Sequence, residues 1–460
     1  MSVPTPDSLP DGPIISWYGD DFSGSAAVLE VLAATGLPSV LFMDIPTPEQ
    51  LAPYASWRGI GIAGTARTRS PSWMEGRLPA VFEFLSSLSA PVAHYKLCST
   101  FDSAPDVGSI GKAMELARPI FGDSWAPLLV AAPPIGRYQV FGNLFAVADG
   151  VVHRLDRHPT MSRHPVTPMD EADIRLHLAG QTSLPIGLVD TVSLDSGHGQ
   201  EALQRELADG NKTVAFDVVD AEALTEIGRL IWENRGQQLL AFGSQGVEYA
   251  LIRHWREMGL IDPDPPDAGF EPAERLAAVS ASMSPLSAVQ LEWAGDHGFE
   301  LIRLDVAAAA DPSRWPLEVD RIGGKALQSV AQGRDPIVYT AIGPDDPSAA
   351  SFRAAVDSSD TSADEARERI GRGLGTILDR LVRHAGITRA AVAGGDTSSH
   401  VARALGVRSL TFLAAIEDGV SMLKADLGEG DGRSLELSSK GGQMGSIDYF
   451  RTVKEGREPT

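Results

Sequence analysis

Short apolar runs alternate with helical patterns along this chain, and that alternation limits its fold more than any other feature. Between Ile14 and Trp255 the apolar runs have the length of strands, and the stretches between several of them carry apolar residues at helical spacing. This order is typical of an α/β domain with a mainly parallel sheet. The predicted strands are residues 14–18, 40–43, 59–63, 93–97, 127–131, 186–189, 214–218 and 238–242, and the predicted helices include 25–34, 75–88, 201–208 and 221–234.

A second alternation follows a proline-rich break. Residues 261–267 read Ile-Asp-Pro-Asp-Pro-Pro-Asp, a sequence that has no periodicity and cannot hold a helix. Beyond it, strands are predicted at 276–281, 301–306, 336–341, 388–393 and 409–413, and helices at 287–298, 317–332 and 363–384. We therefore expect two α/β domains, each a mainly parallel sheet flanked by helices. The predicted layout is a disordered tail at 1–13, a first domain at 14–258, a linker at 259–275 and a second domain at 276–452.

Charge and cysteine usage exclude several classes of function. The formal net charge of −22 over 460 residues argues against nucleic acid or an anionic membrane as partner, because such a surface repels polyanions. The single cysteine, Cys98, excludes an internal disulfide and a thiolate-rich zinc site, which fits a reducing cytosol. No basic start or apolar core marks a signal peptide, and no apolar run reaches the roughly 18 residues of a spanning helix. We expect a cytoplasmic protein.

A glycine turn late in the chain has the features of a phosphate cradle. Gly394 and Gly395 follow a predicted strand, and Asp396, Thr397 and Ser398 lead into a helix. Glycines let an anion approach the backbone, and the first amides of a helix are donors at the positive end of its dipole. The alternative is a plain strand-to-helix turn in which Asp396 or Thr397 caps the helix.

Two further turns in the second half share this character. Ser282 and Ser284 lie between a predicted strand and the helix that begins near Pro285. Gly441 and Gly442 belong to a glycine-rich turn that follows the last strand. One such turn is weak evidence, but three in one domain predict a nucleotide site.

Paired carboxylates follow the first strand of the first half. Asp20 and Asp21, flanked by Gly19 and Gly24, open the first helix at the carboxyl end of that strand, where open parallel sheets bind ligands. One carboxylate could cap the helix while the other acts as a general base or holds a metal. The alternative is compensation of the helix dipole plus capping.

Cations and hydroxyls follow the neighbouring strands. Arg67 and Arg69 come after the third strand, and Lys96 ends the next one, just before Ser99 and Thr100. A guanidinium at such an edge can grip a carboxylate in bidentate fashion. Cys98 is interpreted as a small core residue, because no histidine is placed by the sequence to activate it. Arg137 and the basic run from His153 to His164 could bind an anion but are interpreted first as loop residues.

These motifs together resemble the four-carbon acid sugar kinases, in the order of that family and over nearly the whole chain. Asp20 to Gly24 is similar to its Asp-Asp-Leu/Phe-Thr-Gly signature, and Thr68-Arg69 to its Thr/Ser-Arg. The remaining matches are Gly243-Ser244-Gln245-Gly246, Ser282-Met283-Ser284, Gly394-Gly395-Asp396-Thr397-Ser398 and Lys440-Gly441-Gly442-Gln443-Met444-Gly445.

The resemblance implies an ATP- and Mg²⁺-dependent kinase of small sugar acids, with an acid-sugar domain, a nucleotide domain and an active site in the cleft between them. It implies Asp21 as the base and Asp20 as its partner, with the two roles open to exchange. Metal ligands are not predicted, and a homodimer is allowed. The implied substrate residues are Ser23, Gly24, Arg69, Lys96, Ser99, Thr100 and Arg137, and the nucleotide residues are Ser282, Ser284, Gly394, Gly395, Asp396, Thr397, Ser398, Gly441 and Gly442.

Two other functions compete with a kinase. A nicotinamide-dependent oxidoreductase would also use two α/β domains, but neither glycine turn reads Gly-x-Gly-x-x-Gly with an acidic residue about 20 positions on. A non-catalytic ligand-binding protein with the kinase fold would be favoured by loss of Asp20 and Asp21, and both are present.

The substrate loop departs from the family pattern. Where the family usually has Lys-Ile-Asp-Ser-Thr-Leu-Arg-Gly, this chain has Lys96-Leu97-Cys98-Ser99-Thr100-Phe101-Asp102-Ser103. Cysteine for aspartate and aspartate for arginine change the charge of the loop. We therefore expect a branched or oxidised acid as substrate, such as the 3-oxo-isoapionate used by one branch of the family.

Overall fold

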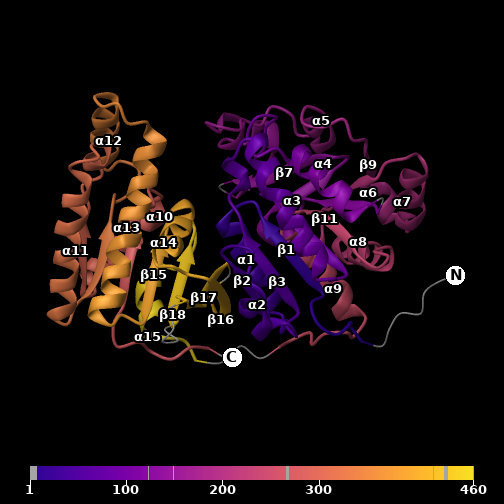
Figure 1. Ribbon diagram of the computed structural model, residues 1–460. Helices are drawn as coiled ribbons and strands as arrows, with labels where there is room; N and C mark the ends of the chain where they lie inside the picture. The colour runs from indigo at the N-terminus through magenta and orange to yellow at the C-terminus, as the bar shows by residue number, and fades with distance from the viewer. Residues whose placement is uncertain are drawn as a thin grey trace. The chain divides into compact units, whose positions relative to one another are not determined.

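The computed structural model describes residues 8–122, 124–148, 150–265, 269–417, 419–428 and 434–458. It divides into two compact units, Met1–Pro265 and Pro266–Thr460, and each is a sheet flanked by helices (Figure 1). The expectation of two mainly parallel α/β domains is confirmed. Part of the predicted tail (1–7) and part of the predicted linker (266–268) lie outside the described residues. Within the rest of that tail, the carbonyls of Pro10 and Gly12 accept hydrogen bonds from Arg58 Nη1 at 2.6 and 2.8 Å.

The main sheet of unit 1 is parallel and runs in the order β2-β3-β1-β4-β11-β5-β10-β9. Gly19 at the end of β1 pairs with Ala63 on β3 and with Lys96 on β4, and Lys96 pairs with Gly243 on β11. The segments that follow these four strands therefore start at one level of the sheet edge. The strands are β1 (Ile15–Gly19), β2 (Ser39–Phe42), β3 (Gly59–Ala63), β4 (Val92–Lys96), β5 (Ala126–Leu129), β9 (Ile186–Val189), β10 (Thr213–Phe216) and β11 (Leu239–Gly243).

Helices cover both faces of this sheet because the strand order reverses between β1 and β4. Right-handed crossovers that run in opposite directions along a sheet place their helices on opposite faces. One set packs together and contains α1 (Phe22–Ala33), α7 (Gly199–Ala208), α8 (Ala221–Glu233) and α9 (Gly246–Glu257), and the other contains α3 (Pro71–Ser87) and α4 (Ile110–Phe121). The short helices are α2 (Pro48–Leu51), α5 (Ile174–Ala179) and α6 (Thr191–Asp195).

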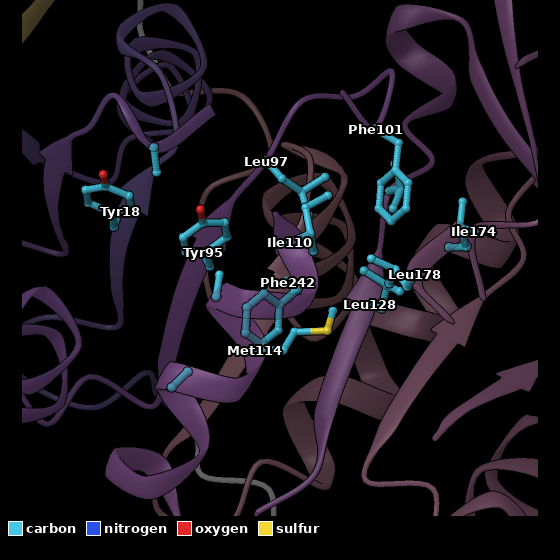
Figure 2. Packing of buried hydrophobic residues seen from close by; sticks show 14 of the residues in the cluster. Tyr18, Tyr95, Leu97, Phe101, Ile110, Met114, Leu128, Ile174, Leu178 and Phe242 are labelled. Atoms are coloured by element: carbon cyan, nitrogen blue, oxygen red, sulfur yellow. The ribbon is translucent and has the colours of Figure 1, made fainter. Parts of the chain in front are cut away.

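Aromatic side chains fix the two central strands of unit 1. The rings of Tyr18 on β1 and Tyr95 on β4 lie side by side with centroids 5.7 Å apart (Figure 2), and Tyr95 also packs on Phe242 of β11 at 5.6 Å. Leu97 and Phe101 continue this core beyond the end of β4. Burying each such side chain contributes about 1.5–3 kcal/mol. The core therefore holds rigidly the strands that carry Asp20 and Lys96.

A small antiparallel sheet in unit 1 corrects one expectation. It consists of β6 (Arg137–Val140), β7 (Asn143–Ala148) and β8 (Val151–Arg154), in that order. Arg137, His153 and Arg154 are strand residues, so their interpretation as loop residues is wrong. The β6–β7 turn at Phe141-Gly142 has positive φ angles of 49° and 79°, and the buried Asp217 accepts hydrogen bonds from both amides. The hairpin thus depends on a carboxylate far away in the sequence.

The sheet of unit 2 runs in the order β13-β14-β12-β15-β18-β17-β16. It is parallel from β13 to β18, and β17, which the sequence did not predict, pairs antiparallel with both neighbours. The strands are β12 (Ala277–Ser280), β13 (Phe299–Arg303), β14 (Asp335–Tyr339), β15 (Arg389–Ala393), β16 (Ser409–Glu417), β17 (Val420–Asp426) and β18 (Ser434–Lys440).

The helices of unit 2 also divide into two packed sets. The helices α10 (Pro285–Asp296) and α15 (Tyr449–Glu455) pack together, and α13 (Ala363–Ala385) packs on α11 (Trp315–Ala331), α12 (Ser348–Asp357) and α14 (Gly395–Ala404). The helix after the glycine turn begins at Gly395, so Thr397 and Ser398, which were expected to lead into it, already belong to its first turn. In the part of the chain that the structure describes, we find no helix with the length and apolarity needed to cross a membrane.

Candidate active site

The acidic and basic residues of unit 1 meet at the carboxyl edge of its sheet, where the strand order reverses between β1 and β4. Such a switch point is the usual ligand site of an open parallel sheet. The backbone holds the three segments together here. The Asp20 amide donates to the Lys96 carbonyl at 2.9 Å, and the Arg67 amide donates to the Asp20 carbonyl at 3.0 Å.

One guanidinium binds both carboxylates. Arg67 Nη2 lies 2.7 Å from Asp20 Oδ1 and 2.8 Å from Asp21 Oδ1. Burial raises the pKa of the Asp20 carboxyl, against the opposing effect of the Arg67 charge. Only 2% of the Asp20 side chain is exposed, compared with 27% for Asp21. Asp21 also caps α1 by accepting a hydrogen bond from the Gly24 amide at 2.8 Å. Asp21 is therefore the carboxylate that a ligand can reach.

Lys96 adds a second cation at the same point. Its side chain is buried, and Nζ donates to the Leu97 carbonyl at 2.8 Å. A Cβ atom placed on Gly24 would lie 2.5 Å from Asp21 Oδ1, 2.8 Å from Lys96 Nζ and 3.7 Å from Arg67 Nη2. Asp21, Lys96 and Arg67 thus converge on Gly24, which explains the need for glycine there. Ser23 is exposed on the same first turn of α1.

The loop beyond β4 is folded back on itself. Thr100 Oγ1 donates to Asp102 Oδ1 at 2.8 Å and lies 3.0 Å from Cys98 Sγ. Ser99, Thr100 and Asp102 are all half-buried, whereas Phe101 is buried with a φ of 60°, in the left-handed region. Burial raises the pKa of the Cys98 thiol, which keeps it protonated. Cys98 is half-buried rather than part of the core, and its lack of a nucleophilic role stays a prediction.

A contact that the sequence did not suggest anchors this loop. Ser103 Oγ lies 3.0 Å from His177 Nε2 on α5 and accepts a hydrogen bond from Gln181 Nε2 at 2.9 Å. The sequence carries no signal for this pairing, because 74 residues separate Ser103 from His177.

The two remaining predicted arginines differ in their surroundings. Arg137, half-buried on β6, donates from Nη1 to the carbonyls of Ile135 and Gly136 at 3.1 and 3.2 Å. Burial lowers its pKa, and the charge of Asp102 opposes that effect. Arg69 is exposed, and its guanidinium lies 5.6 Å from the centroid of the Trp73 ring. Sequence reasoning emphasised Arg69, whereas Arg67 makes the contacts to the aspartates.

The three turns of unit 2 meet at a second switch point. The strands β12, β15 and β18 are adjacent and parallel, and the strand order reverses between β12 and β15. The Ala281 amide donates to the Ala393 carbonyl at 3.0 Å, and the Gly394 amide donates to the Lys440 carbonyl at 2.9 Å. The structure therefore brings the predicted nucleotide residues of all three strands to one edge.

A group of serines joins the first turn to the last. Ser284 caps α10 by accepting from the Ser287 amide at 3.1 Å, and its hydroxyl donates to the Gly442 carbonyl. Ser287 Oγ lies 2.9 Å from Ser282 Oγ and 3.1 Å from the Gly442 carbonyl. A Cβ atom on Gly442 would lie only 2.3 Å from Ser282 Oγ. A side chain at Gly442 would therefore displace the Ser282 hydroxyl where these two turns touch. Gly441, next to it, is exposed.

The middle turn has the backbone that a phosphate cradle needs. Gly394 has a φ of 128°, a value that residues with a side chain rarely adopt. It immediately precedes the first turn of α14 at Gly395. Thr397 and Ser398 are buried, and Ser398 Oγ donates back to the Gly394 carbonyl at 2.9 Å. The side chain of Asp396 lies outside what the structure describes.

Comparison with known proteins identifies the family. Residues 15–251 match the family model described as a sugar-binding N-terminal domain, and residues 277–450 match the one described as a nucleotide-binding C-terminal domain. The chain is 43% identical to a 3-oxo-isoapionate kinase of Paraburkholderia graminis over 97% of its own length and 95% of that protein. The chain belongs to the four-carbon acid sugar kinase family.

A second relative and a solved structure share less sequence with this chain. A 3-oxo-tetronate kinase of Pseudomonas fluorescens is 29% identical over 95% of this chain and 96% of that protein. The crystal structure of the Haemophilus influenzae protein HI1011 has the same fold, with a TM-score of 0.72 at 23% identity over 95% of this chain and 98% of that one. The resemblance inferred from the motifs is therefore confirmed. Both curated relatives carry the name of a kinase, and no finding supports the oxidoreductase alternative. The roles of individual site residues stay predictions.

Proposed function

We propose that this protein transfers the γ-phosphate of ATP to a hydroxyl of a branched oxo sugar acid of the 3-oxo-isoapionate type. The observation that carries the proposal is the cluster of Asp20, Asp21, Arg67 and Lys96 at the switch point of unit 1. Phosphoryl transfer needs little covalent help from a protein. It needs an oriented hydroxyl, a nearby base, and groups that stabilise charge on the phosphate.

Asp21 serves as the base in this proposal. Its partly exposed carboxylate can accept the proton of a substrate hydroxyl. The buried Asp20 cannot reach a substrate and acts only by holding Arg67 in place. By bonding both carboxylates, Arg67 fixes the orientation of Asp21 and offsets the repulsion between two adjacent negative charges. Asp20 is thus a positioning residue.

Arg137 and Lys96 are the proposed receptors of the substrate carboxylate. Asp20 and Asp21 together balance the charges of Arg67 and Lys96, so Arg137 supplies the additional positive charge that an acid requires. Asp102 offers a carboxylate that can accept a hydrogen bond from a substrate hydroxyl. The other predicted substrate contacts are Ser23, Gly24, Ser99 and Thr100. Arg69 is exposed and lies over the Trp73 ring, so only the family motif supports its contact with substrate.

The turns of unit 2 are the proposed site of ATP. The backbones of Gly394 and Gly442 both lie near Ser282, and the hydroxyls of Ser282 and Ser284 fit phosphate oxygens. The first turn of α14 offers the positive end of a helix dipole. Within the described ranges, no group of three or more His, Cys, Asp or Glu side chains could hold a metal ion. We therefore expect Mg²⁺ to enter with ATP, held mainly by the phosphates.

The test is ADP release across a panel of sugar acids. The panel comprises 3-oxo-isoapionate, a 3-oxo-tetronate, D-threonate and D-erythronate, each with ATP and Mg²⁺. We expect the highest kcat/KM on 3-oxo-isoapionate and poor activity on the two unoxidised, unbranched acids. Equal activity on D-threonate would reject the substrate class, and no ADP release with any acid would reject the kinase. Light scattering would test for the homodimer that the resemblance allows.

A further inference from the structure

Lys440 is a buried cation that the proposed site does not yet use. It is the last residue of β18, and 3% of its surface is exposed. Its Nζ lies 3.5 Å from the Gly441 carbonyl and 5.2 Å from the centroid of the Tyr449 ring. Across the described residues no carboxylate lies within ion-pair distance of it. A single long hydrogen bond and a ring face leave most of the ammonium group without a strong partner.

Such a residue is costly for the fold. An ammonium group removed from water loses hydration that only paired charges or several hydrogen bonds can replace. Burial lowers the pKa of Lys440 to about 8, and the charge of Glu417 opposes that effect only in part. The Glu417 carboxylate accepts from the Ser446 amide at 2.9 Å, and the Tyr449 hydroxyl donates to Ser438 Oγ at 2.9 Å. Both neighbours are thus already engaged, and an apolar side chain would satisfy the packing better.

The place of Lys440 explains what the charge is for. Its own carbonyl accepts from the Gly394 amide, and the turn with Gly441 and Gly442 follows it directly. The backbone of Lys440 therefore joins the two glycine turns, and its ammonium group lies beside the Gly441 carbonyl at the start of the second turn. A buried lysine at a glycine turn after a parallel strand supplies a point charge that amides and hydroxyls lack.

We propose that Lys440 binds the phosphate chain of the nucleotide, adding a positive charge to the amides and hydroxyls of the Gly394 and Gly442 turns. This inference rests on the proposed function, because it takes ATP as the ligand of unit 2. Lys440 belongs to the family motif that ends in Gly445, and the proposal gives this residue a role in binding. The buried charge lowers the stability of the fold, and we infer that it is retained because it binds phosphate.

Nucleotide binding without any sugar acid tests the assignment. Titration calorimetry would compare the wild-type chain, Lys440→Met and Lys424→Met with ATP, ADP and adenosine as ligands. Lys424 is an exposed lysine on the neighbouring strand β17, so Lys424→Met makes the same change of charge outside the turns. We expect Lys440→Met to weaken ATP and ADP roughly 10- to 100-fold, the usual effect of one hydrogen bond to a charged group. The Kd of Lys440→Met for adenosine should change less than about threefold, and so should the Kd of Lys424→Met for each ligand.

Several results would overturn the proposal. Unchanged ATP affinity in Lys440→Met would show that the ammonium does not meet phosphate, and an equal loss of adenosine would indicate a distorted pocket. Failure of the wild-type chain to bind ATP would also reject it. Failure of the sugar-acid panel would not, because binding is measured without substrate. Circular dichroism and the urea midpoint would check that Lys440→Met is folded, because the variant should unfold at no lower urea concentration than wild type.

Discussion

Removing the Lys440 charge should stabilise the ligand-free protein, and the gain should depend on pH. Lys440→Met replaces one unbranched side chain with another of similar length, so it keeps the packing and removes the buried ammonium group. The lowering of the pKa from 10.5 to about 8 corresponds to about 2.5 pH units, and 1.36 kcal/mol per unit gives about 3 kcal/mol. At pH 7 we therefore expect the variant to be more stable than wild type by about that amount.

The sign of the pH dependence follows from the proton count. Below about pH 8 the lysine is charged in both the folded and the unfolded chain, so wild type bears the full cost. Between about pH 8 and 10.5 the unfolded chain binds more protons than the folded chain, and the stability of wild type rises with pH. The advantage of the variant should shrink across that range. Tyr449, whose ring faces Lys440, stays neutral in that range because burial raises the pKa of its hydroxyl.

Urea unfolding at pH 7, 8, 9 and 10 would measure this difference, followed by circular dichroism and tryptophan fluorescence. Lys424→Met serves again as control, because an exposed lysine should change the free energy of unfolding by less than about 0.5 kcal/mol. A less stable Lys440→Met variant at pH 7, or an advantage that does not change up to pH 10, would refute the reasoning.

Three further predictions concern the two sites. Asp21→Asn should lower kcat roughly 10²-fold or more through loss of the base while ATP affinity stays nearly constant, and near-normal turnover would move that role elsewhere. Gly442→Ala places a Cβ atom 2.3 Å from Ser282 Oγ, so it should raise the KM for ATP at least tenfold by displacing the serine turn, whereas Gly76→Ala, with open space around it, should not. Asp102→Arg should shift kcat/KM toward D-threonate by restoring a cation to the loop, and an unchanged preference in the panel would exclude Asp102 as a specificity residue.

Local patterns in the sequence were sufficient to predict two α/β domains, each with a sheet between layers of helices. The predicted strands 59–63 and 186–189 coincide with β3 and β9, because glycines, prolines and polar turns mark their ends in the sequence itself. The antiparallel strands β6, β7, β8 and β17 were missed. The β6–β7 turn depends on the distant carboxylate of Asp217, and β17 is held by pairing with its two neighbours, neither of which a local window contains.

The motifs and their family were readable from the chain alone, because glycine turns, paired aspartates and strand ends are local features. Which cation meets which carboxylate was decided by tertiary structure. Arg67 rather than Arg69 reaches Asp20 and Asp21, since the short helix at Ala66–Thr68 follows β3 and places Arg67 over the sheet edge. Likewise, burial of Lys440 arises only where β18 packs beside β15 and against Tyr449. Burial and charge pairing depend on residues far apart in sequence, and only the folded chain brings them together.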